Sequence, residues 1–174
     1  MTSRPADAQG TSDLHDPVDW ARHFWRKQGL GKGEDAFISM SSVLRFHRLM
    51  IEAVEEDLKK HRLNLTDYML LMTLQLSETG TRLISKLARN LLIHATTATL
   101  ATDRLEVRGL LKRSPHPTDR RATLVSITAE GRELVRAASL GLEAFEYGLA
   151  GTSKADRAEL VEILTRLRAA AGDK

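Results

Sequence analysis

The sequence contains no cysteine, so it cannot form a disulfide, use a thiolate in catalysis or bind zinc through sulfur. No apolar run approaches the roughly 18 residues that a membrane-spanning helix needs. The first fifteen residues, MTSRPADAQGTSDLH, lack the apolar stretch behind a basic flank that marks a secretory signal. We therefore expect a disordered tail over 1–15, no membrane association and a cytoplasmic location.

Residues capable of acid–base or metal chemistry are present, but they do not form a recognisable motif. The six histidines are far apart in the chain, and none belongs to a His-x-x-x-His pair with an acid on the same helix face. No nucleophile motif is present either. We expect no enzyme activity, cofactor or metal site, while a zinc site assembled from distant residues stays open.

Positive charge is concentrated in the middle of the chain. Residues 81–121 hold nine Lys and Arg against three Asp and Glu, a net charge of +6. The whole chain carries +3, so the rest carries −3. A basic segment between acidic ends favours an anionic partner for that segment, and the alternative is an ordinary solvated surface.

Hydrophobic periodicity predicts a mostly helical chain. Asp16 or Asp19 can cap the first helix, and Thr128 can cap the sixth. Ser153 with Asp156 resembles a capping box before the last helix. The first six predicted helices cover 18–28, 37–60, 63–77, 84–90, 95–108 and 129–149. Two short strands are predicted at 110–113 and 122–128, joined by the segment SPHPTDRR.

Two short helices followed by a hairpin are typical of a winged helix-turn-helix. The fold class is therefore mostly α with a small β-hairpin wing, flanked by N- and C-terminal helices. In such a fold the second helix enters the major groove of DNA. An arginine on the wing meets the concentrated negative potential of the minor groove.

The motifs LTDYMLLMTL, LARNLLIHATTATLATDRLEVRGLLKR, DRRATLVSIT and AEGRELV resemble the MarR family of bacterial transcriptional regulators. The resemblance covers about 65–135. It implies a homodimer that represses a palindromic operator on double-stranded DNA and is released by a small molecule, aromatic or acidic. It also implies helices for dimerisation and a ligand cleft at 16–62, DNA binding at 63–127, and further dimerisation helices at 128–174.

The resemblance also assigns candidate DNA contacts. In the recognition helix and the strand after it these are Thr96, Thr97, Thr99, Arg104, Arg108 and Arg113. For Arg104, a phosphate contact or an internal ion pair is as plausible as base reading. In the wing they are Asp119, Arg120 and Arg121, with Arg121 entering the minor groove and Asp119 holding it in place.

Three positions depart from the family pattern. Leu92 replaces a glycine that is common in the turn, His94 replaces a serine cap, and Leu100 replaces a polar base reader. Because histidine caps helices poorly, we expect Thr96 or Thr97 to cap instead, or a shifted helix start. With few bidentate readers, phosphate contacts and DNA shape should carry a larger share of recognition.

The N-terminal segment, with Trp20 and Trp25, resembles a MarR subgroup with an added helix, some of whose members bind urate. Met69 and Ala101 stand where that subgroup has an acid and an arginine. The candidate ligand-binding residues are Trp25, His47, Arg48, Tyr68 and Met72, although the aromatic ones also suit a dimer core. The alternative function is a dimeric ligand-binding protein that acts through a partner protein, with DNA binding secondary.

Overall fold

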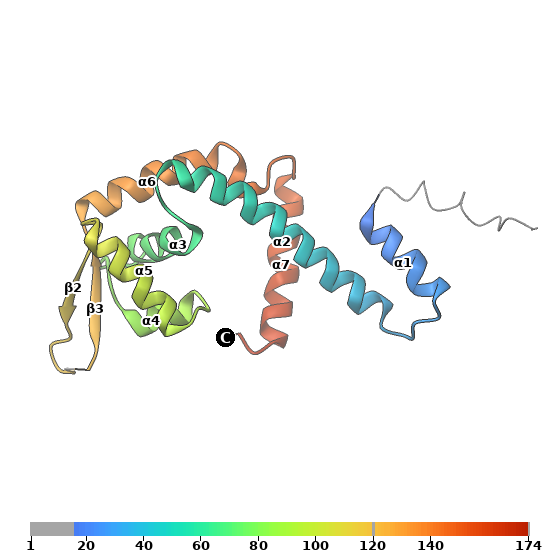
Figure 1. Cartoon of the computed structure of the whole chain (residues 1–174), viewed down its shortest axis with the longest axis horizontal. Coiled ribbons are helices and arrows are strands. Elements are labelled where there is room, and N and C mark those ends of the chain that lie inside the picture. Colours follow the sequence, from blue (N-terminus) through green and yellow to red (C-terminus); the bar gives the residue numbers. More distant parts are fainter. Residues whose placement is uncertain (1–15, 120, 174) are drawn as a thin grey trace, which may run out of the picture. The chain divides into compact units, whose positions relative to one another are not determined.

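In the computed structural model, residues 16–119 and 121–173 are described, so the tail expected over 1–15 lies outside them. Two compact units divide the chain, Met1–Leu49 and Met50–Lys174. The helices are α1 (Pro17–Lys27), α2 (Glu34–Lys60), α3 (Leu65–Gln75), α4 (Ile84–Asn90), α5 (Ala95–Val107), α6 (Ala129–Glu143) and α7 (Lys154–Ala170) (Figure 1). The predicted fold class, mostly helical with a small sheet, is confirmed.

The first unit holds α1 and the beginning of α2. Asp16 caps α1, because its Oδ1 accepts the backbone N–H of Val18 at 2.6 Å. The loop from α1 to α2 is closed by an ion pair between Arg26 and Glu34 at 2.8 Å. Helix α2 begins three residues before the expected position 37, because Glu34 and Asp35 occupy its first turn, where negative charge is favoured.

The second unit holds the hydrophobic core, and α3 lies in it as its apolar pattern predicts. Leu70, Leu71 and Leu74 of α3 are fully buried, together with Leu58 near the end of α2. Helix α3 is shorter than expected, since Asn64 caps it by accepting the backbone N–H of Asp67 at 2.8 Å. No helix in the described part of the chain is long and apolar enough to cross a membrane.

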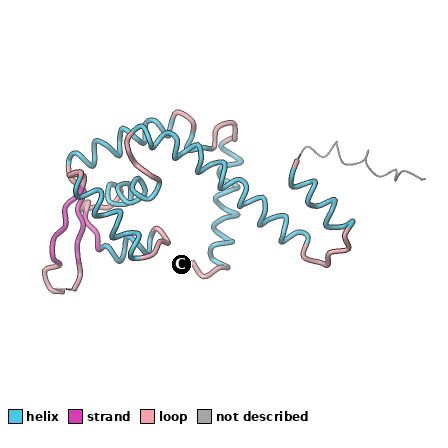
Figure 2. The backbone as a smooth tube through the Cα atoms, viewed as in Figure 1, coloured by secondary structure: helices cyan, strands magenta, loops and turns pink. Residues whose placement is uncertain are grey.

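One strand after α3 and two strands after α5 form a three-stranded antiparallel sheet (Figure 2). The spatial order of the strands is β1-β3-β2, so β3 lies in the middle. Strands β2 (Leu111–Pro115) and β3 (Thr123–Ile127) form the predicted hairpin. Strand β1 (Thr81–Leu83) was not predicted, because three residues are too short to show an alternating pattern. This strand pairs with β3 and so joins the start of α4 to the wing.

Helix α6 ends at Glu143, not near 149 as predicted. A short 3₁₀ turn, Glu146–Gly148, follows it, and Glu146 and Tyr147 both have φ near +55° (54° and 57°). That left-handed backbone cannot continue a right-handed helix. The capping box before α7 is confirmed, with Ser153 and Asp156 bonded to each other's backbone.

Candidate nucleic-acid interface

The two helices of the helix-turn-helix have the bounds that the sequence predicts within one residue. Between them, Leu92 has φ of +51°, the conformation that a glycine in the turn would adopt without strain. Helix α5 begins at Ala95 with His94 at its N-cap and without a side-chain cap bond. The expectation that Thr96 or Thr97 caps the helix, or that its start is shifted, is therefore wrong.

Helix α5 has one buried and one exposed face, set by its 3.6-residue repeat. Ala98, Ala101, Thr102 and Leu105 are fully buried and fix the helix on the core. Thr96, Thr97 and Thr99 are exposed near the N-terminal end, where the resemblance places base contacts. The hydroxyl of Thr99 donates to the Ala95 carbonyl at 3.0 Å, so its methyl and its lone pairs stay available.

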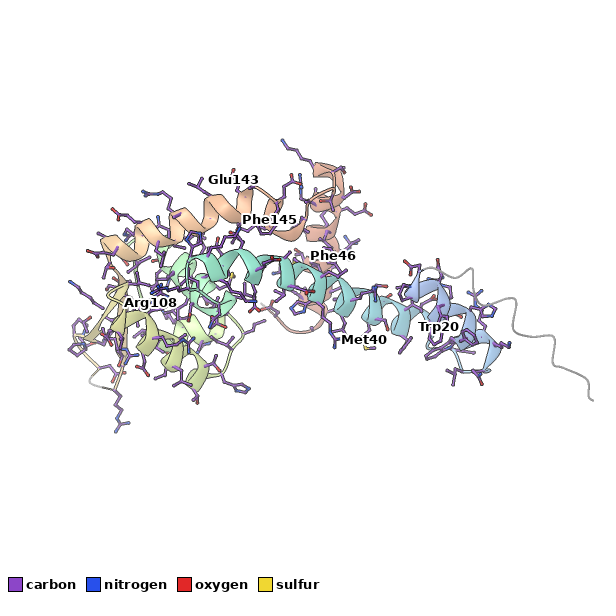
Figure 3. All side chains as sticks on the ribbon, turned by 45° about the horizontal axis from the view of Figure 1, so that its top comes forward. Trp20, Met40, Phe46, Arg108, Glu143 and Phe145 are labelled. Carbon is purple, nitrogen blue, oxygen red and sulfur yellow. The ribbon has the colours of Figure 1, made fainter. Side chains whose placement is uncertain are left out.

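Two arginines on one flank of α5 hold the corner between α2 and α3. Arg104 Nη2 lies 2.7 Å from Oδ1 of Asp67, whose side chain is only 6% exposed. Of the roles left open for Arg104, the internal ion pair is the one observed. Arg108, at the end of the helix (Figure 3), donates to the carbonyls of Arg62 at 2.6 Å and His61 at 3.1 Å.

Arg113 of β2 holds the other flank. Its guanidinium pairs with Asp103 of α5 and donates to the Thr99 carbonyl at 3.3 Å. Its backbone N–H donates to Glu106 Oε1 at 3.0 Å, and its Nε lies 3.5 Å from Glu106 Oε2. The recognition helix is therefore attached to the wing on one side and to the α2–α3 corner on the other.

The wing tip carries the remaining candidate contacts. Asp119 accepts the backbone N–H of Arg121 at 2.9 Å, so the carboxylate organises the turn from which the exposed Arg121 projects. Arg120 lies outside the described residues. The tip is longer than a two-residue hairpin, which fits its lack of glycine, and His116 closes it by donating its backbone N–H to the Ala122 carbonyl at 3.1 Å.

The candidate ligand residues fall in both units. In the first, the Trp25 indole donates to the Gly31 carbonyl at 2.9 Å and packs on Phe37, while His47 and Arg48 are exposed on α2. In the second, Tyr68 is buried and its hydroxyl lies 3.0 Å from that of Ser139. Burial raises the pKa of Tyr68 to about 12.

Met72, one turn beyond Tyr68 on α3, is partly buried against the core. A hollow of about 400 Å³ on α2 is lined by Arg48 together with Ser41, Leu44, Arg45 and Leu49. Among residues 16–119 and 121–173, His, Asp and Glu do not gather in a group of three that would suit a metal ion.

Sequence reasoning missed Asp67 and the carbonyls of His61 and Arg62. These groups belong to no motif, and they lie 37 to 47 positions away from the arginines they bind. The one available signal was an acid inside the otherwise apolar segment LTDYMLLMTL, because a charge there needs a partner.

Known proteins share this fold and sequence pattern. The family model for MarR matches residues 63–123. Sco5413, a MarR family transcriptional regulator from Streptomyces coelicolor, is 32% identical with a TM-score of 0.72, over 80% of this chain and 96% of its own. Sco3205 of the same organism, solved in complex with DNA, is 21% identical with a TM-score of 0.69, over 79% and 87% of the two chains.

BpsR of Bordetella bronchiseptica, whose DNA binding is regulated by 6-hydroxynicotinic acid, is 24% identical with a TM-score of 0.66, over 74% and 98% of the two chains. At this identity, BpsR and Sco3205 support the fold alone. Sco5413 is similar in sequence as well, over nearly its whole length, and its winged helix-turn-helix is the fold described above. The chain belongs to the MarR family of transcriptional regulators.

Proposed function

We propose that this regulator is a homodimeric repressor that binds a palindromic operator and is released by a small aromatic or acidic ligand. The observation that carries the DNA-binding part is the pairing of an exposed threonine face on α5 with an exposed arginine on the wing. Residues 63–127 would bind DNA, and 16–62 with 128–174 would form the dimer. Half-sites would lie about one helical turn apart, on adjacent major grooves.

Helices α7 and α2 expose apolar side chains that a second copy of the chain could cover. Helix α7 has 17 residues and none of them is buried, while Val161 and Leu167 are 61% and 55% exposed. The first unit likewise exposes Phe37, Met40 and Leu44 along α2. Most of the stability of a helix in a protein comes from packing its apolar face, so such faces need a covering surface.

Dimerisation is tested by the mass in solution. The chain weighs 19.4 kDa, so light scattering should give about twice that value. Leu167→Glu should shift the population toward the monomer, because it places a charge in the covered face. The matched control is Thr165→Glu, which adds the same charge at an exposed polar position of α7. A monomer in the unmodified protein would overturn this part of the proposal.

Binding to DNA is tested by a salt titration of fluorescence anisotropy with operator and random duplexes. Affinity should fall steeply with salt, since phosphate contacts release counterions. Arg121→Ala should weaken binding and make the log–log salt slope shallower by about 0.9 for each half-site. Arg136→Ala removes an exposed charge from α6 instead and should leave the slope unchanged. A flat salt response would favour action through a partner protein.

The proposed ligand-binding residues are Trp25, His47 and Arg48 in the first unit, and Tyr68 and Met72 in the second. Arg48 is the group best suited to hold a carboxylate, since a guanidinium forms charge-assisted bonds with it. 6-Hydroxynicotinic acid and other aromatic acids should raise the melting temperature, because binding to the folded protein stabilises it by mass action. Arg48→Ala should abolish the shift and Arg136→Ala should retain it. An equal shift in both variants would contradict the assignment of Arg48.

A further inference from the structure

The outward face of α5 is apolar for a DNA-binding surface. Thr96, Leu100, Asp103 and Val107 recur every three or four residues and therefore share one face, opposite the buried Ala101. Leu100 is 54% exposed and Val107 is 89% exposed. A large aliphatic side chain in the middle of such a face has no role in holding the helix on the core.

The arginines that flank this face are occupied within the protein. Arg108 donates from both terminal nitrogens to backbone carbonyls, so the two nitrogens that would form a bidentate pair with guanine already hold the α2–α3 corner. Arg104 is paired with the buried Asp67, and leaving that carboxylate unpaired is unfavourable. Arg113 is held by Asp103 and Glu106. Guanine reading by these three arginines would require breaking these bonds.

We infer that Leu100, flanked by Thr96 and Val107, reads thymine through its C5-methyl group in the major groove. That methyl is the one apolar feature that a base pair presents there. The Asp103 carboxylate on the same face is paired with Arg113 and has no hydrogen-bond donor to offer guanine, whose major-groove edge carries only acceptors. This inference rests on the proposed DNA-binding function, and it assigns base discrimination to methyl contacts, with the wing and phosphates supplying affinity.

The first step of the test is an operator recovered from a random duplex pool by the full-length protein. The recovered half-site should contain thymine at the positions that face α5. Each of those thymines is then replaced, one at a time, by deoxyuridine, which lacks only the methyl group. Loss of one buried methyl should weaken binding about fourfold at the contacted position, judged from the transfer free energy of a CH₂ group.

The second step assigns the contact to Leu100. Leu100→Ala should weaken binding to the thymine operator and remove the difference between the thymine and deoxyuridine duplexes. The matched control is Leu76→Ala, which removes a side chain that is 79% exposed at the end of α3 and should keep the difference. Circular dichroism of both variants checks that the fold is retained.

Two outcomes overturn the inference and leave the proposed function intact. One is sequence-specific binding that is insensitive to deoxyuridine at every position. The other is a thymine–deoxyuridine difference that survives in Leu100→Ala. Failure to recover any preferred sequence would instead overturn both the methyl readout and the operator-binding function.

Discussion

Leu92 in the helix-turn-helix should be a site where glycine stabilises the protein. Its φ of +51° costs an L-residue about 1–2 kcal/mol relative to glycine. The greater freedom of glycine in the unfolded chain reduces the gain in stability by about 0.4–1 kcal/mol. The Leu92 side chain is 77% exposed, so its removal loses little packing. Leu92→Gly should therefore raise the free energy of unfolding by about 0.5–1 kcal/mol.

Urea unfolding followed by circular dichroism measures this gain, at one fixed protein concentration because the proposed dimerisation would contribute to stability. A rise in melting temperature of about 2 °C should accompany it for a chain of this size. Leu92→Ala is the control, since it removes the same side chain and keeps the Cβ that makes the left-handed conformation costly. If the glycine and alanine variants were equally stable, backbone strain at Leu92 would not be the cause.

Two further substitutions test the packing of the second unit. Gly131→Ala should lower the free energy of unfolding by about 3 kcal/mol, because a Cβ there would collide with the Leu110 carbonyl, which cannot rotate away. The control is Gly31→Ala, at an open position, which should be nearly neutral. Thermal unfolding compares the two variants, and equal melting temperatures would contradict the collision. Tyr68→Phe should cost about 1 kcal/mol at pH 7, since it removes the bond to Ser139. Because the folded-state pKa of Tyr68 is raised from 10 to about 12, its contribution is complete below pH 10 and is lost as pH rises toward 12, whereas the phenylalanine variant should lack this decline.

The sequence predicts the helices of this protein better than it predicts their ends. Periodicity locates α4 and α5 within one residue, although the turn between them, 91–94, is itself mostly apolar. The end of α6 was missed, since its 3₁₀ turn uses a left-handed Glu146 and Tyr147, residues that carry no turn signal of their own. Strand β1 was missed because its pairing with β3 joins segments that are far apart in the chain.

The candidate interface shows a second limit of sequence reasoning. Thr96, Thr97 and Thr99 follow from a motif and lie exposed on α5 as a local pattern can predict. The partners of Arg104 and Arg108 depend on how α5 packs against the α2–α3 corner, a tertiary relation that no local spacing encodes. For this reason a basic segment can be identified from the sequence, while the groups that each arginine binds cannot.

Arg104 and Arg108 are both bound within the protein, but they differ in the positive charge that they present to DNA. Arg104 is paired with a carboxylate, so its charge is largely cancelled, whereas Arg108 donates to neutral carbonyls and keeps its full charge. The log–log salt slope of binding depends on the number of positive charges close to phosphates, whether or not these charges form hydrogen bonds. Arg108→Gln should therefore make the salt slope shallower, and replacing the whole pair, Arg104→Gln with Asp67→Asn, should change it little, because that double variant removes no net charge. The opposite ranking would show that Arg104 leaves Asp67 when the protein binds DNA, and that the corner between α2 and α3 is released in the complex.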